Sequence, residues 1–244
     1  MRPSGRALRA VLFDAGGTLI TTAEPVGETY AREARARGVE IPAWRLDDAF
    51  RRVLRRAPAM AFPGEAPERV RELERRWWRE RVRETVRAAD SAVRAGDFAG
   101  GFDAFFEALF RHFARPAAWR ARPGAEEALR ALRARGLATA VVSSFDQRLG
   151  PILEGLGLRR HLDAVLLPAD AGAAKPDPRI FAAALARLGV AAGEAVYVGD
   201  DVDDGASGAA QAGVEAIDVA GLATLADLPA RLFPGDAARE EPPA

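Results

Sequence analysis

The 244-residue chain contains no cysteine, two histidines and a single lysine. Without cysteine, disulfide bonds, thiolate metal sites and a cysteine nucleophile are excluded. A basic excess is missing too, because Lys and Arg number 35 together and so do Asp and Glu. This balance argues against a protein that binds nucleic acid. The first apolar run, residues 10–13, is far too short to cross a membrane, so we expect a cytoplasmic protein without a membrane partner.

Apolar residues make up 49% of the chain and charged residues 29%, which is enough apolar material to bury a core. The basic residues are arginines except for Lys175. A site that requires a compact ammonium would retain a lysine, because a planar guanidinium does not replace it. Chance in an arginine-rich chain accounts for a lone lysine equally well until its neighbours are considered.

Strand and helix patterns alternate after residue 123, whereas residues 21–120 show only helical patterns. Strands are predicted at 9–13, 137–142, 165–167, 195–198 and 215–219. Helices are predicted at 28–37, 46–56, 67–89, 102–113, 125–135, 147–156, 179–188, 206–212 and 224–232. Such alternation predicts an α/β fold with a Rossmann-like parallel sheet core. We expect residues 1–20 and 121–234 to form this core, residues 21–120 a helical domain inserted after the first strand, and residues 235–244 a flexible tail.

Polar side chains follow three of the predicted strands. Asp14 follows the strand 9–13, Ser143 and Ser144 follow the strand 137–142, and Asp200 and Asp204 follow the strand 195–198. Because ligands bind at the carboxyl ends of parallel strands, we expect these side chains to gather there. Carboxylates with room for water favour Mg²⁺. With a metal and a hydroxyl holding a phosphoryl group, an aspartate could attack it in line.

Lys175 precedes a predicted helix in the segment Lys175-Pro176-Asp177-Pro178, where Asp177 is placed to cap the helix and Pro178 to occupy its first position. The lysine ammonium would be a further group for the phosphoryl oxygens. Each of these residues alone has a simpler explanation: Asp14 as a turn residue, Ser143 as a capping hydroxyl, residues 200–204 as a solvated loop. Their joint order and their positions at strand ends favour the functional interpretation.

These segments resemble the four motifs of the haloacid dehalogenase superfamily. Asp14, Ser143, Lys175, Asp200 and Asp204 match the nucleophile, the hydroxyl, the lysine and the acidic motif residue by residue. The resemblance implies Mg²⁺ held by Asp14, the carbonyl of Gly16, Asp200 and Asp204. It implies a phosphoryl group bound by Ser143, Ser144 and Lys175, and an aspartyl-phosphate at Asp14. It also implies that the insertion is a cap of the C1 type.

Within the superfamily, the chain is most similar to the haloacid dehalogenase-like hydrolase domain-containing protein 3 group, also called rhythmically expressed gene 2-like. Four stretches carry this similarity: residues 25–30, Trp77-Trp78, residues 143–149 and residues 175–181.

Three positions depart from the superfamily pattern. Phosphatases of the superfamily have an aspartate two residues after the nucleophile, as general acid and base, where this chain has Gly16. A general acid contributes about 10²–10⁴-fold in rate, so we expect a weakened phosphatase. Gly205 stands where the acidic motif often has its second aspartate, and Asp204 fits a shorter spacing. Ser144 stands where many relatives have asparagine.

Three functions are compatible with these motifs. The first is a Mg²⁺-dependent phosphatase acting on a small phosphate ester. The second is a 2-haloacid dehalogenase, which also lacks the second aspartate, but Asp200 and Asp204 argue against an enzyme that needs no metal. The third is a catalytically impaired binding protein, against which the retention of Asp14, Lys175 and Asp200 argues. A phosphonate-cleaving enzyme is excluded, because it would need a lysine in the insertion.

The insertion does not reveal the substrate. Its arginines and Trp77, Trp78 and Trp119 are typical of solvated faces and core anchors rather than of ligand contacts. His112 and His161 are isolated in the sequence, and no role is predicted for them. The sequence leaves the oligomeric state open.

Overall fold

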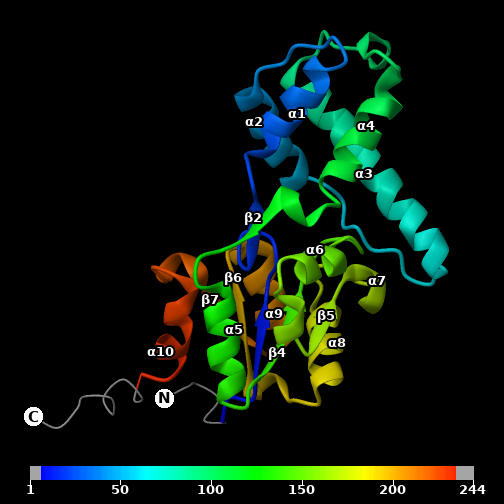
Figure 1. Cartoon of the computed structure of the whole chain (residues 1–244). Helices are drawn as coiled ribbons and strands as arrows, with labels where there is room; N and C mark the ends of the chain where they lie inside the picture. Colours follow the sequence, from blue (N-terminus) through cyan, green and yellow to red (C-terminus); the bar gives the residue numbers. More distant parts are fainter. Residues whose placement is uncertain (1–6, 235–244) are drawn as a thin grey trace, which may run out of the picture.

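A computed structural model describes residues 7–234, and a five-stranded parallel sheet lies at its centre (Figure 1). The strand order is β5-β4-β1-β6-β7, so the chain runs outward to one side of β1 and then returns to the other side. The strands are β1 (Ala10–Phe13), β4 (Ala138–Val142), β5 (Ala164–Leu166), β6 (Ala195–Gly199) and β7 (Glu215–Asp218). The predicted Rossmann-like parallel sheet is confirmed, with the reversal of strand order at β1.

Successive residues of β1 face opposite sides of the sheet, as the two-residue period of a strand requires. Val11 and Phe13 pack in one apolar cluster with α5 (Ala125–Ala134), α6 (Leu149–Gly155) and α10 (Leu228–Leu232). Ala10 and Leu12 pack in a second cluster with α8 (Pro178–Leu188) and α9 (Ser207–Gln211). Helices therefore cover both faces, and β1 is buried on both sides.

Two short antiparallel strands, β2 (Ile20–Thr22) and β3 (Trp119–Ala121), lead into and out of a helical insertion, residues 23–118. Its helices are α1 (Val26–Arg35), α2 (Ala43–Arg55), α3 (Pro67–Ala89) and α4 (Gly101–His112). They enclose their own apolar cluster, in which rings of α1 and α4 pack with aliphatic side chains of α2 and α3. Figure 1 shows the insertion above the edge of the sheet from which β1 leads into β2.

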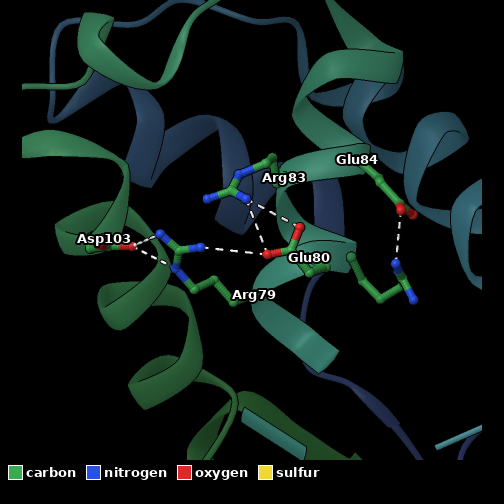
Figure 2. A network of polar contacts seen from close by, with 6 residues as sticks. Arg79, Glu80, Arg83, Glu84 and Asp103 are labelled. Atoms are coloured by element: carbon green, nitrogen blue, oxygen red, sulfur yellow. Dashed lines mark hydrogen bonds and ion pairs between the residues drawn. The ribbon is translucent and has the colours of Figure 1, made fainter. Parts of the chain in front are cut away.

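Arginine side chains on α3 make ion pairs at the surface of the insertion (Figure 2). Arg79 binds Asp103 of α4 with an Nε–Oδ1 distance of 2.6 Å. Arg83 reaches both oxygens of Glu80, three residues away, at 3.1 Å. Exposed pairs of this kind each contribute little to stability, so the apolar cluster below them holds α3 against its neighbours.

Several details differ from the sequence-based predictions. Strands β2 and β3 were not expected, because each has three residues and they pair across almost a hundred positions. The four-residue helix α7 (Pro168–Ala171) is also new, and the predicted helix 224–232 begins with a 3₁₀ turn, Leu225–Asp227, before α10. The predicted tail, residues 235–244, lies outside the described residues.

Short turns complete the described chain. The 3₁₀ turns are Ala95–Asp97, Pro116–Ala118, Arg159–His161, Ala192–Glu194, Val219–Gly221 and Leu225–Asp227, and a π-turn spans Val202–Ala206. Among residues 7–234, no helix has the length and apolar character needed to cross a membrane.

Candidate active site

Asp14 lies directly after β1, at the carboxyl edge of the sheet. Its backbone N–H donates to the carbonyl of Val198 over 2.9 Å, which continues the pairing of β1 with β6. The side chain is almost buried, with 7% exposed, and its Oδ1 accepts from the N–H of Ala15 at 2.7 Å. Two neighbouring strands and one backbone donor therefore hold this carboxylate in a fixed position.

Lys175 is the partner of Asp14. Its Nζ lies 2.7 Å from Oδ2 of Asp14 and donates to the phenol oxygen of Tyr197 at 3.0 Å. The lysine is buried, with 8% exposed. Asp177 accepts from the N–H of Arg179 at the start of α8, and Pro178 occupies the first position, as predicted. This cap anchors the segment that carries the ammonium.

Ser143 and Ser144 follow β4 and line the same pocket as Asp14 and Lys175. Ser143 is buried, and its N–H donates to the carbonyl of Leu166 at 3.1 Å. Its hydroxyl accepts from the N–H of Phe145 at 3.3 Å. That bond closes a local turn and does not cap a helix, because the next helix, α6, begins only at Leu149. It leaves the hydroxyl hydrogen available to donate.

Asp200 follows β6 and accepts a hydrogen bond from the hydroxyl of Thr18 at 2.9 Å. Desolvation raises the pKa of Asp200 above its usual value, the Asp14 carboxylate adds to the rise, and the Thr18 hydrogen bond opposes it. The loop after β1 approaches so closely that a Cβ at Gly17 would lie 2.0 Å from Oδ2 of Asp200. Gly17 also has a φ of +80°, so glycine is required here on two counts.

Asp204 lines the pocket beside Asp201, whose Oδ1 accepts from the N–H of Asp204 at 3.0 Å. Among the side chains that the structure describes, no three Asp, Glu or His are arranged as a metal-binding group. Two interacting carboxylates, Asp14 and Asp200, nevertheless suit Mg²⁺, which often takes only one or two carboxylates and keeps several waters. Metal binding by Asp204 stays a prediction.

Gly16 lies in the pocket beside Asp14. Unlike Gly17, it is absent from the glycines with positive φ, and no neighbouring atom lies within 4 Å of an added Cβ. The loop therefore does not require glycine at this position. Backbone geometry thus does not explain why glycine stands at the position where the resemblance implies an aspartate.

A pocket of about 550 Å³ extends from these strand ends into the insertion. Trp77, Trp78 and Trp119 all line it. Trp78 and Trp119 also pack against the apolar clusters of the insertion and the core, as expected for core anchors, whereas their place in the pocket wall was not predicted. Aromatic residues at helical spacing look the same in a core and in a pocket wall, so the sequence carried no signal that separates the two. Tyr197 and Thr18 were likewise missed, because their contacts depend on tertiary packing.

One polar cluster joins the insertion to the core. Asp146, which is 1% exposed, accepts from the indole N–H of Trp78 at 2.6 Å. Arg148 binds both Asp146 oxygens and donates to the carbonyl of Phe110 at 3.2 Å. A core loop therefore contacts both α3 and α4.

The described fold agrees with comparisons to known proteins. The family described as haloacid dehalogenase-like hydrolase matches residues 8–213. Haloacid dehalogenase-like hydrolase domain-containing protein 3 from Mus musculus is 39% identical over 218 residues, which cover 89% of this chain and 84% of that protein.

Two further relatives are named phosphatases. A phosphoserine phosphatase from Thermus thermophilus is 43% identical over 96 residues, 39% of each chain. The crystal structure of a HAD phosphatase from Thermococcus onnurineus superposes with a TM-score of 0.61 at 25% identity, covering 93% of this chain and 99% of that one. With the family match spanning most of the sequence, the chain belongs to the haloacid dehalogenase-like hydrolases.

Proposed function

We propose that the protein is a Mg²⁺-dependent phosphatase of small phosphate esters that forms an aspartyl-phosphate at Asp14. The observation that carries this proposal is the buried ion pair between Asp14 and Lys175, 2.7 Å long, which lines the pocket and interacts electrostatically with the Asp200 carboxylate. The phosphatase names of two relatives support the same reaction class.

Different residues of the site have different roles in such a reaction. An Asp14 oxygen attacks phosphorus, the ester P–O bond breaks, and the leaving oxygen keeps the electron pair. Lys175 and the Ser143 hydroxyl hold phosphoryl oxygens, and the Ala15 N–H keeps the attacking carboxylate in place. Asp14 and Asp200, with the Gly16 carbonyl, would hold Mg²⁺, which neutralises charge on the phosphoryl group when bound. Water then releases inorganic phosphate and regenerates Asp14.

The dehalogenase alternative is disfavoured by Asp200. A second carboxylate whose pKa is raised by desolvation and by Asp14 is a natural place for a cation. A metal-free enzyme acting on carboxylate substrates would gain nothing from that negative charge.

Gly16 leaves the departing oxygen without a proton donor. We therefore expect the protein to hydrolyse p-nitrophenyl phosphate, whose phenoxide leaves unprotonated, and to be nearly inactive on an alkyl phosphate. The Gly16→Asp variant should raise kcat/KM by about 10²–10⁴-fold for the alkyl ester and by less for the aryl ester. No neighbouring atom lies within 4 Å of a Cβ added at Gly16, so the backbone does not oppose a side chain there. The measurement is kcat/KM for both esters in both proteins.

Two controls make the result specific. Gly16→Asn has the size of the aspartate without its proton and should not reproduce the gain. Asp14→Asn should abolish turnover of both esters, which excludes a contaminating phosphatase. Robust hydrolysis of alkyl phosphates by the unmodified protein would contradict the proposed role of Gly16.

A further inference from the structure

The pocket above Asp14 is much larger than a phosphoryl group. Its volume of about 550 Å³ lies in the range of roughly 300–1,000 Å³ of pockets that bury whole organic ligands. A cavity of about 150 Å³ already holds a benzene ring. A phosphate ester with one small ring would therefore leave most of this pocket unfilled.

Carbon-rich side chains form the wall that faces away from the strand ends. The insertion contributes rings and aliphatic groups, among them Phe50, Leu54, Trp77, Phe106, Phe110 and Phe113. The rings also contact one another: Phe106 and Phe110 have centroids 5.4 Å apart. A second contact crosses to the core, where Trp119 meets Phe145 at 5.3 Å. Such a wall accepts flat aromatic ligands edge-on or stacked.

The Arg148 guanidinium and the indole N–H groups of this wall already have hydrogen-bond partners. Among the described residues that line the pocket, the only basic groups are Lys175 and Arg148. Arg148 is bound to both oxygens of Asp146, and its guanidinium carbon lies 3.9 Å above the centroid of the Phe110 ring. The indole N–H groups of Trp77 and Trp78 donate to Pro58 and Asp146.

Away from the strand-end loops, the remaining polar side-chain groups of the pocket lining are the hydroxyls of Thr21, Thr22 and Tyr30. A sugar or an amino acid would lose several hydrogen bonds to water on entering this wall and would gain few in return. An apolar ligand loses none, and its burial is favourable in proportion to the area removed from water.

We propose that the substrate is an aryl phosphate monoester whose aromatic group is larger than a single ring, with fused or linked rings packed against this wall. The proposal rests on the phosphatase function proposed above, and its evidence is the lining of the pocket. The glycine at position 16 favours the same substrate class, because a phenoxide is the kind of leaving group that departs without a general acid.

Phenyl phosphate and 2-naphthyl phosphate test the proposal. Their phenols are similarly acidic, so a difference between the esters reports the pocket and not the leaving group. We expect kcat/KM to be about tenfold or more higher for the naphthyl ester. Isothermal titration of the uncleaving Asp14→Asn variant should give a dissociation constant for the naphthyl ester lower by the same factor.

Variants in helix α2 and just after its end locate the effect. Leu54→Gln places an amide on the pocket wall and should bring the naphthyl-to-phenyl ratio close to one. Ala57→Leu, also in the lining, should reduce the ratio by filling space, and it serves if the first variant does not fold. Trp44→Gln changes an apolar side chain on the same helix that is 68% exposed, so the ratio should stay as in the unmodified protein.

The outcomes separate this inference from the proposed function. Equal constants for the two esters, or a preference for a sugar phosphate, would overturn the inference even if hydrolysis is fast. Tight naphthyl ester binding without hydrolysis would support the pocket and contradict the phosphatase. Absence of binding by either ester would overturn the inference.

Discussion

Lys175 occupies an enclosed position that suits the ammonium of a lysine. It is the only lysine in the sequence, and the structure buries it between Asp14 and Tyr197. Burial and the Asp14 carboxylate raise the pKa of Tyr197, so its phenol stays neutral and accepts from the ammonium. The site is thus built for a compact cation with donors in several directions.

We therefore expect Lys175→Arg to be a severe substitution. The planar guanidinium is longer and cannot occupy the same enclosed position between Asp14 and Tyr197. The loss in kcat/KM against p-nitrophenyl phosphate should be about 10²-fold or more, comparable to the loss of a charge-stabilising donor. Tyr197→Phe is the comparison, because it removes one acceptor and keeps the ammonium, and it should cost much less. Full activity of the arginine variant would refute the role of Lys175.

Two adjacent glycines should behave in opposite ways. Gly17→Ala places a Cβ against Asp200 and forces a side chain into the left-handed region, with a strain of about 1 kcal/mol. Displacing the Asp200 carboxylate should abolish the millimolar Mg²⁺ binding that we expect by isothermal titration. Gly16→Ala enters open space and should leave Mg²⁺ binding unchanged. Equal affinities in the two variants would argue against Asp200 as a metal ligand.

At the scale of elements, helix α3 buries a carboxylate against the core. Glu74 is 5% exposed, and desolvation with the nearby charge of Asp146 raises its pKa to about 7. A hydrogen bond from the backbone at Gln147 and the charges of Arg148 and Arg71 act in the opposite direction. The ionised form is therefore the unfavourable one at the contact between α3 and the core loop.

The sign of the pH effect follows from this raised pKa. The stability that protonated Glu74 contributes is fully present below about pH 4.5 and is lost as the pH rises through about 7. Glu74→Gln should match the unmodified protein in Tm at pH 5 and exceed it by a few degrees at pH 8. Thermal unfolding of both proteins across this range is the measurement. Glu72→Gln, which alters an exposed side chain of the same helix, should show no such divergence.

How far the sequence predicts an element depends on what determines that element. Helix α3 begins and ends where predicted, at Pro67 and Ala89, because proline at its first turn and a long polar face are local signals. The three-residue strands β2 and β3 have no periodicity of their own and exist only because distant segments meet. The same contrast holds in the site. Residues at strand ends were predictable from topology, whereas Tyr197, Thr18 and the aromatic wall depend on packing that no local pattern encodes.

Considered whole, the described chain contains separate apolar clusters for the sheet and for the helical insertion. A pocket between two such units depends on the contacts that hold them together. The buried group formed by Asp146, Arg148 and Trp78 is one such contact, and its Arg148 and Trp78 side chains line the pocket. Asp146 thus links the core loop that carries it to helix α3 of the insertion, next to the pocket.

Asp146→Asn should loosen the insertion without unfolding the sheet. The amide can still accept from Trp78, but the Arg148 charge is left without its partner, which costs about 3–5 kcal/mol for a fully buried pair and less here because Arg148 retains some exposure. Amide hydrogen exchange should accelerate in α3 and α4 and stay slow in β1, β4 and β6.

Asp177→Asn is the matched control for this variant. Asp177 binds Arg179 with the same two-residue spacing and the same backbone hydrogen bond, but at the surface, where the arginine side chain is 68% exposed. Because an exposed pair contributes little, its exchange pattern should stay that of the unmodified protein. If Asp146→Asn accelerated exchange equally throughout the sheet and the insertion, the two would unfold as one unit, and the coupling would not be local to this contact.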